Sequence, residues 1–227
     1  MDKKPISRED KFDRDLTILL DRLTANTEPM VENKLSMLKE WLIKLHKENL
    51  VKINHSVMEL VCAKHLIEKN YEIQLEYPLN ELLNCDLYGI KGLGNIIVEI
   101  ETGFIPPENA LSPLTYTSAR LASKIIRYSS FAGKFALGVP PHYILPFPRT
   151  LAKPPRNRTE VEIEQIKALC DAFYSKPPVT LEEIRNARIQ EIYIIDVDRT
   201  KTIEIDPESY LRRAMQKGVV FDCLSPE

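Results

Sequence analysis

Residues 84–103 read NCDLYGIKGLGNIIVEIETG, and this stretch decides the fold. Two apolar runs flank Gly92-Leu93, which places glycine at the first central position of a type II′ hairpin turn. We therefore predict a β-hairpin in which Asp86 lies opposite Glu99. Side chains two apart on a strand share a face, so Glu99 and Glu101 point the same way. The hairpin is expected to gather three carboxylates on one face of a sheet.

Such a cluster is self-repelling unless a cation lies within it. Hard oxygen ligands suit Mg²⁺ or Mn²⁺, so the sequence predicts a divalent metal site at Asp86 and Glu99. The alternative is that Glu99 and Glu101 form the solvated face of an ordinary edge strand. Their neighbours Ile96, Ile97 and Val98 are too apolar for a comfortable edge, which favours the metal site.

The hairpin lies within an alternation of helical and strand patterns. Ser56 and Glu59 have capping-box spacing at the predicted start of the third helix. Ser112-Pro113, an N-cap followed by proline at the first helical position, opens a later helix, and Thr159 opens another with a capping box to Glu162. Helices are predicted over 8–25, 29–49, 56–69, 113–130, 159–174, after 180 and from 207, and strands over 71–77, 84–90, 95–102, 135–139, 191–197 and 202–205.

This order predicts an α/β protein with a mixed β-sheet flanked by helices. Residues 1–50 are expected to form an N-terminal helical extension, and residues 51–145 the core that carries the acidic cluster. Residues 146–227 are expected to pack on that core as a basic Pro-rich loop (140–158 in its full extent), helices and a C-terminal strand pair.

The composition restricts the class of protein. The chain has 227 residues, 44% of them hydrophobic, enough for a sizeable core. Every apolar run is interrupted by charge and the first residues are polar, so we expect no transmembrane segment, no signal peptide, no membrane partner and a cytoplasmic location. The four cysteines are widely scattered and form no CxxC pair, so we expect neither a structural zinc site nor a disulfide framework.

The charge distribution is uneven although the formal net charge is only −2. No Asp or Glu occurs between Glu108 and Glu160. A basic segment next to a metal site is typical of polyanion binding. Chance segregation, or a basic face that pairs with acids elsewhere, would give the same pattern. The residues predicted to contact nucleic acid are Arg120, Arg127, Arg149, Lys153, Arg156 and Arg158.

A helix with Glu59, a strand, a strand with Asp86 and a strand with Glu99 follow one another before the next helix. This order resembles the core of the PD-(D/E)xK nuclease superfamily. The passages MELVCAKHLIEKNYEIQLEY and VEIETG look like segments of archaeal Holliday-junction resolvases and related archaeal viral or plasmid nucleases. The resemblance covers residues 55–139.

The resemblance implies a restriction-endonuclease-like fold and a metal-dependent DNA nuclease with Mg²⁺ or Mn²⁺, without an organic cofactor. Asp86 and Glu99 would bind the metal, together with the backbone carbonyl of Ile100. Glu59 would bind it directly or through water, or would serve only as a capping residue of its helix. Branched or recombining DNA would be the substrate, and a homodimer is expected.

The sequence departs from this motif at Glu101, which occupies the position of a catalytic lysine. Glu101 could act as a base or an extra ligand. Alternatively, Lys124 could replace the lysine, since it shares a helix face with Arg120 and Tyr128. A third possibility is a nuclease-fold protein without catalysis that binds nucleic acid or a protein partner, and a fourth is an α/β protein with no nucleic-acid role.

His55 has two interpretations. It could contact metal or phosphate, or it could be a surface residue at a helix start, which we favour from the sequence alone.

Overall fold

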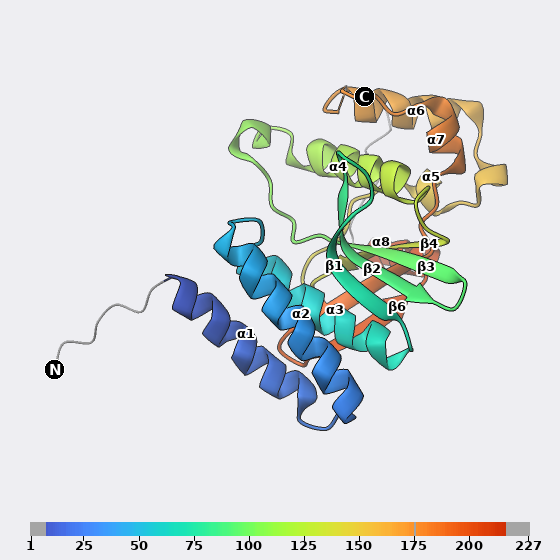
Figure 1. The fold of residues 1–227 in the computed structure, drawn as a ribbon. Helices are drawn as coiled ribbons and strands as arrows, with labels where there is room; N and C mark the ends of the chain where they lie inside the picture. Colours follow the sequence, from blue (N-terminus) through green and yellow to red (C-terminus); the bar gives the residue numbers. More distant parts are fainter. Residues whose placement is uncertain (1–7, 175, 217–227) are drawn as a thin grey trace.

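A six-stranded sheet runs through the centre of the molecule in the order β1-β2-β3-β4-β5-β6 (Figure 1). The structure is a computed structural model, and it describes residues 8–174 and 176–216. The strands span Glu72–Pro78 (β1), Asn84–Lys91 (β2), Gly94–Ile100 (β3), Lys134–Val139 (β4), Glu191–Asp196 (β5) and Lys201–Ile205 (β6). The β3–β4 and β4–β5 pairs are parallel and the others antiparallel. The predicted mixed sheet flanked by helices is confirmed.

Helices cover both faces of this sheet. They span Arg8–Thr24 (α1), Pro29–Lys47 (α2), Ile53–Glu68 (α3), Pro113–Tyr128 (α4), Arg149–Ala152 (α5), Glu160–Asp171 (α6), Leu181–Asn186 (α7) and Pro207–Gln216 (α8). Short 3₁₀ turns lie at Pro107–Asn109 and Pro155–Asn157. Among the described residues, no helix is both long and apolar enough to cross a bilayer.

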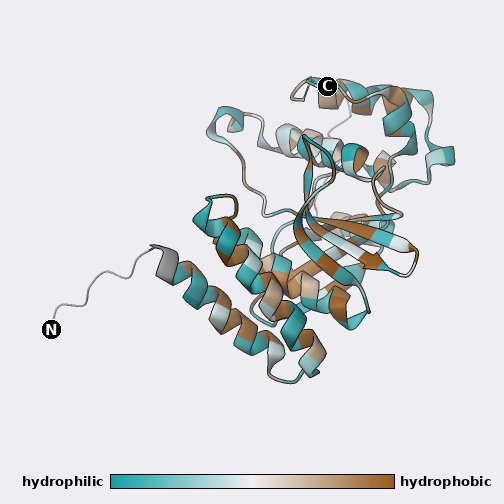
Figure 2. Ribbon diagram, viewed as in Figure 1, coloured by the Kyte–Doolittle hydropathy of each residue, from teal (hydrophilic) through white to brown (hydrophobic). Residues whose placement is uncertain are grey.

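Each face of the sheet has its own apolar core, and Figure 2 shows hydrophobic segments in brown along the strands and the helices that cover them. Helices α1, α2 and α3 share one buried cluster with Leu87, Val98 and Ile195. Helices α4 to α8 share the other with Ile97 and Leu137. The segment predicted as an N-terminal extension therefore covers the same face as α3, and α4 covers the opposite face.

The hairpin register is as predicted. Leu87 pairs with Val98 and Lys91 with Gly94, so the turn is Gly92-Leu93. Gly92 has a φ of 58°, which a glycine adopts without steric cost. Strand β3 ends at Ile100, one residue before Glu101, whose amide donates to the carbonyl of Gly138 on β4. The register brings the backbones of Asp86 and Glu99 opposite each other at the end of the ladder.

Helix α3 begins three residues earlier than predicted. Its N-cap is Lys52, and no side-chain cap is formed there. The predicted capping box of Ser56 and Glu59 is therefore wrong, because both residues lie inside the helix and both are fully buried. A capping role cannot explain Glu59.

Strands β1 and β2 change faces together at Glu76 and Asp86. Leu75 and Leu87 belong to the α3-side core, whereas Cys85 and Tyr77 contact the α4-side core. Residues two apart on a regular strand would share a face. Glu76 has a φ of 51°, a left-handed conformation that is uncommon outside glycine, and it accommodates the reversal. Asp86 thus lies where the sheet is accessible from both helical layers.

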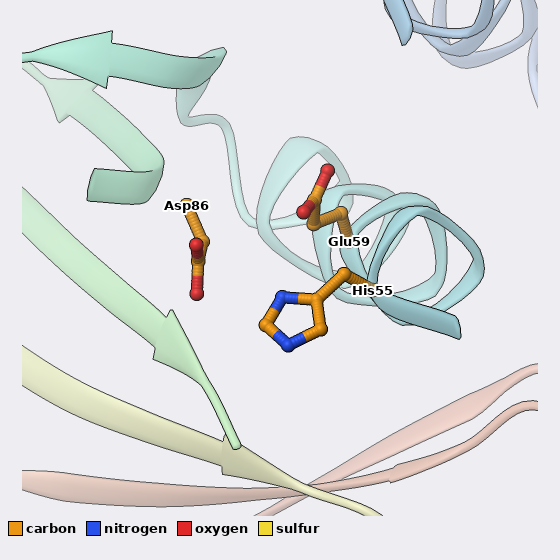
Figure 3. A group of neighbouring side chains, drawn as sticks. All are labelled: His55, Glu59 and Asp86. Carbon is orange, nitrogen blue, oxygen red and sulfur yellow. The ribbon is translucent and has the colours of Figure 1, made fainter. Parts of the chain in front are cut away.

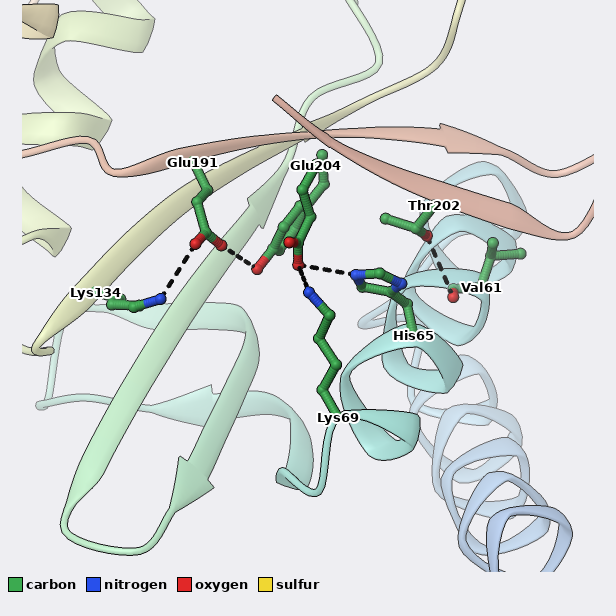
Figure 4. A network of polar contacts seen from close by, with 8 residues as sticks. Val61, His65, Lys69, Lys134, Glu191, Thr202 and Glu204 are labelled. Carbon is green, nitrogen blue, oxygen red and sulfur yellow. Dashed lines mark hydrogen bonds and ion pairs between the residues drawn. The ribbon is translucent and has the colours of Figure 1, made fainter. Parts of the chain in front are cut away.

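Polar contacts fix the far end of α3 to the sheet edge (Figure 4). The carboxylate of Glu204 on β6 accepts from Lys69 at 2.5 Å and lies 2.9 Å from His65. Thr202 donates to the carbonyl of Val61 at 3.5 Å. These contacts hold the helix that carries Glu59 in a defined position over the sheet.

Candidate metal centre

The carboxyl group of Glu59 is buried in the interior without a hydrogen-bond partner among the described residues. Its side chain is on α3, its exposed fraction is 0%, and neither carboxylate oxygen has a hydrogen-bond partner among the described residues. Burial raises the pKa of Glu59 well above its ordinary value, and the nearby charges of Asp86, Glu76 and Glu99 raise it further. A buried carboxyl without a partner is unfavourable for folding, which makes this position a candidate for a bound cation.

Three potential ligand residues converge on this position. One ligand atom each from His55, Glu59 and Asp86 lies within 4.8 Å of the others (Figure 3). His55 precedes Glu59 by one helical turn, so both project from the same side of α3. Asp86 belongs to β2, and Figure 3 shows its side chain facing His55 and Glu59. The preferred interpretation of His55 as an unrelated surface residue is therefore replaced by a place in this cluster.

Asp86 joins the cluster to the strand that carries the other acids. Its Oδ2 accepts from the backbone amide of Ile100 at 2.5 Å. Its own amide donates to Oε1 of Glu99 at 3.1 Å. These two bonds continue the hairpin beyond its last regular pair and fix the orientation of both carboxylates.

Two cations from α4 neutralise Glu99 and Glu101. Lys124 Nζ lies 2.9 Å from Glu99 Oε2 and 2.7 Å from Glu101 Oε1. Arg120 lies 2.6 Å from Glu101 Oε2. The three predicted residues Glu99, Glu101 and Lys124 are thus brought together, with both carboxylates buried.

The electrostatic environment of these groups is strongly perturbed. Burial raises the pKa of Glu99 to about 8, with a further increase from Asp86 and an opposing effect of Lys124. The acids hold the pKa of Lys124 well above its ordinary value in spite of its burial. The lysine is therefore a permanent cation in this cluster.

Glu76 belongs to the acidic cluster around Asp86, although it was not predicted from the sequence. Burial raises its pKa to about 7, Asp86 adds to the increase and Lys124 opposes it. In the sequence it occupies one position of an alternating strand, and nothing in that pattern indicates the left-handed backbone that turns it toward Asp86. The i, i+4 spacing of His55 and Glu59, by contrast, was a usable signal.

The donor set fits a divalent cation. Carboxylate oxygens are the ligands of Mg²⁺ and Mn²⁺, and an imidazole nitrogen among them favours the transition metal. Five acids (Glu59, Glu76, Asp86, Glu99 and Glu101) meet two cations in the described structure, so carboxyl groups outnumber their cationic partners. Lys124 pairs with Glu99 and Glu101, and no ion pair of Glu59 or Asp86 is present among the described residues. Glu99 lies outside the converging triad.

One residue of the predicted nucleic-acid surface is not on the surface. Arg158 is 6% exposed, and its guanidinium donates to the carbonyls of Thr150, Leu151, Lys153, Ile184 and Arg185. It fixes the loop after α5 against the end of α7. The prediction that Arg158 contacts nucleic acid is wrong, because its hydrogen-bonding groups are already used within the fold.

Most of the other predicted basic residues also have internal partners. Arg127 donates to the carbonyl of Pro177, and Lys153 pairs with Glu162. Arg120 is occupied by Glu101 and by the carbonyl of Phe104. Arg149 and Arg156 are exposed. The alternative that basic residues pair with acids elsewhere therefore accounts for part of the acid-free segment.

Comparison of the chain with protein-family models, with curated proteins and with solved structures found no match.

Proposed function

We propose that this protein is a divalent-metal-dependent nuclease that hydrolyses phosphodiester bonds in DNA on a restriction-endonuclease-like core. The observation that carries this proposal is the fully buried carboxylate of Glu59, which has no partner among the described residues and lies beside Asp86 and His55. The order α3, β1, β2, β3, α4 and β4 around it supports the proposal, because the PD-(D/E)xK core that the sequence resembles has the same order of helices and strands. Branched or recombining DNA and a homodimer remain part of the proposal.

A structural role does not account for this arrangement. An unsatisfied buried carboxyl costs free energy, and an apolar side chain of similar size would remove that cost. Asp86 and His55 lie within 4.8 Å of Glu59, so a cation at this position would satisfy three ligands at once. The retained acid is thus better explained by binding than by packing.

Mg²⁺ or Mn²⁺ would be held by Glu59, Asp86 and His55, with Glu99 and the carbonyl of Ile100 as the further ligands that the resemblance implies. When bound, such an ion supplies Lewis-acid chemistry, which activates water and neutralises phosphate charge. The imidazole of His55 favours Mn²⁺ over Mg²⁺. Asp86 keeps its orientation through the amide of Ile100.

Lys124 is proposed to take the role of the lysine that the motif lacks at Glu101. Its ammonium reaches Glu99 from α4, so a positive charge is available beside the metal ligands. Glu101 lies between Lys124 and Arg120 and is therefore suited to positioning these two cations. A carboxylate held by two cations is a poor general base, which argues against that alternative for Glu101.

A second candidate function is binding of nucleic acid or a protein without catalysis. Glu101 at the lysine position favours it, since the resemblance gives that lysine a direct role in the reaction. The scarcity of exposed arginines among the predicted contacts does not separate the two candidates, because both need affinity for a polyanion.

Cleavage of supercoiled plasmid and of a four-way DNA junction with Mg²⁺ or Mn²⁺ tests the proposal. We expect hydrolysis by the wild type and a loss of at least 100-fold in Asp86→Asn and Glu59→Gln. Glu191→Gln is the matched control, because Glu191 is an acid on β5 that pairs with Lys134. DNA binding by the wild type without cleavage in either metal would favour the second candidate.

A further inference from the structure

A cavity of about 520 Å³ is lined by residues of α3 that are sequence neighbours of His55 and Glu59 in the metal centre. It lies at the carboxyl ends of the three parallel strands, since Thr102 follows β3, Pro140 follows β4 and Val197 follows β5. Asn54 and Met58 of α3 form its opposite wall. Clefts at the carboxyl ends of parallel strands are common ligand sites in α/β proteins.

The cavity and the metal centre share one turn of α3. Asn54 and Met58 immediately precede His55 and Glu59 and are offset from them by about 100° around the helix. Thr102 directly follows Glu101. A nucleotide whose phosphate lies at the metal centre would therefore have its neighbouring group at the mouth of this cavity.

The lining of the cavity suits an uncharged ring better than a phosphate. Its buried lining residues Met58, Pro140 and Ile195 are apolar. Asp196 and Asp198 also line it, together with His142 and Arg199, and Arg199 already pairs with Asp196 at 3.3 Å. The two carboxylates would repel a phosphate group. The same carboxylates accept hydrogen bonds from ring N–H and exocyclic amino groups, which nucleobases provide.

We propose that this cavity binds one unstacked nucleobase of the nucleotide adjacent to the cleaved phosphodiester bond. This inference rests on the proposed nuclease function and adds the class of substrate. Taking a base out of a paired helix is costly, and the cost is smallest where the base is already unpaired. The enzyme would then prefer DNA with unpaired nucleotides, such as branch points, mismatches and single-stranded ends.

The rim of the cavity is held in place before any ligand arrives. Arg22 of α1 donates to the carbonyls of Val197 at 3.1 Å and Asp198 at 2.5 Å. The carboxylate of Asp196 accepts from the backbone amide of Arg199 at 3.0 Å. A preformed site loses less entropy on binding, and the N-terminal helix thereby contributes to recognition.

The test places 2-aminopurine, whose fluorescence rises when it leaves the base stack, at each position near the cleavage site of a DNA with an unpaired segment. Fluorescence is measured with Ca²⁺ at saturating protein, and cleavage with Mn²⁺. Val57→Trp fills the cavity from α3, and Asn54→Phe narrows it from an exposed position that is safe for folding. Ser130→Trp is the control, since Ser130 is exposed and lines a cavity at the opposite end of β4.

We expect a severalfold rise in fluorescence at one position with the wild type and with Ser130→Trp. Both cavity variants should abolish this rise and slow cleavage of the unpaired substrate at least 10-fold. The subsite is refuted if no position responds, or if both variants cleave and fluoresce as the wild type does. Cleavage by the wild type with unaffected variants would leave the nuclease intact and remove the subsite. A fluorescence rise that both cavity variants abolish, without any cleavage, would support the base-binding cavity and contradict the nuclease function.

Discussion

The ammonium of Lys124 lies 2.7 Å from the carboxylate of Glu101, although the two residues come from different elements. Glu101 follows β3 in the interior of the sheet, and Lys124 descends from α4. The contact shows how the chain combines a glutamate at one position with a lysine from another element. The positive charge next to Glu99 and Glu101 therefore comes from α4 and not from a lysine on β3 itself.

Removing this lysine should disable the site. We expect Lys124→Ala to lower DNA cleavage at least 100-fold and to lower the free energy of unfolding, because Glu99 and Glu101 lose a buried counter-charge. Lys167→Ala is the control, since Lys167 pairs with Asp171 on the surface of α6, away from the acidic cluster. Cleavage measured under single-turnover conditions separates chemistry from binding. Equal rates for the wild type and Lys124→Ala would exclude a role for this lysine.

His55 should set the metal preference. We expect the wild type to bind Mn²⁺ more tightly than Mg²⁺ and His55→Ala to lose about 10-fold in Mn²⁺ affinity with a smaller change for Mg²⁺. Titration calorimetry on the metal-free protein measures both affinities. His65→Ala, altered on the same helix but paired with Glu204, should bind as the wild type does. An identical loss for both metals would contradict a direct role of the imidazole.

The carboxyl group of Glu59 should lower the free energy of unfolding of the metal-free protein and should be needed for Mn²⁺ binding. We expect Glu59→Leu to raise the free energy of unfolding of the metal-free protein by about 1–3 kcal/mol, because a buried group without a partner is removed. The same variant should lose Mn²⁺ binding. Glu59→Gln retains a buried polar group and should gain less. Urea unfolding with and without metal measures both effects, and a large loss of stability in Glu59→Leu would show that the carboxyl has a structural partner.

The acidic cluster should make stability depend on pH. The pKa of Glu99 is raised to about 8 and that of Glu76 to about 7, against about 4.5 in an unfolded chain. Between these values the folded protein holds more protons, so the free energy of unfolding should fall as pH rises from about 4.5 to about 8. The stability that comes from these two protonated carboxyl groups is fully present below pH 4.5. Unfolding of Glu99→Gln in urea at pH 5, 6.5 and 8 should show a smaller decrease than the wild type, and equal slopes would contradict the assignment.

Arg158 and Arg156 should behave in opposite ways. We expect Arg158→Met to lower the free energy of unfolding by at least about 3 kcal/mol, since five carbonyls, in three buried and two partly buried hydrogen bonds, lose their donor. Arg156→Ala should leave stability unchanged and weaken DNA binding, with a shallower salt dependence by about one ion. Thermal unfolding and salt titrations of DNA binding measure the two effects. A stable Arg158→Met variant with weakened DNA binding would reverse the assignment.

The sequence predicted the sheet more reliably than the site. The Gly92-Leu93 turn fixed the hairpin register, because glycine and turn length determine which residues pair. The site depends on features that local spacing does not encode. The earlier start of α3 buries Glu59, and the positive φ of Glu76 redirects two strands. The burial of Arg158 depends on carbonyls as far away as Arg185.

The order of strands in the sheet has a consequence for synthesis of the chain. Each strand pairs with its neighbours in the sequence, so the sheet can grow in the direction in which the polypeptide leaves the ribosome. All five acids of the cluster precede Lys124, and the last of them, Glu101, does so by 23 residues (124 − 101). The acids of the hairpin are therefore synthesised before the lysine that pairs with Glu99 and Glu101 in the finished fold.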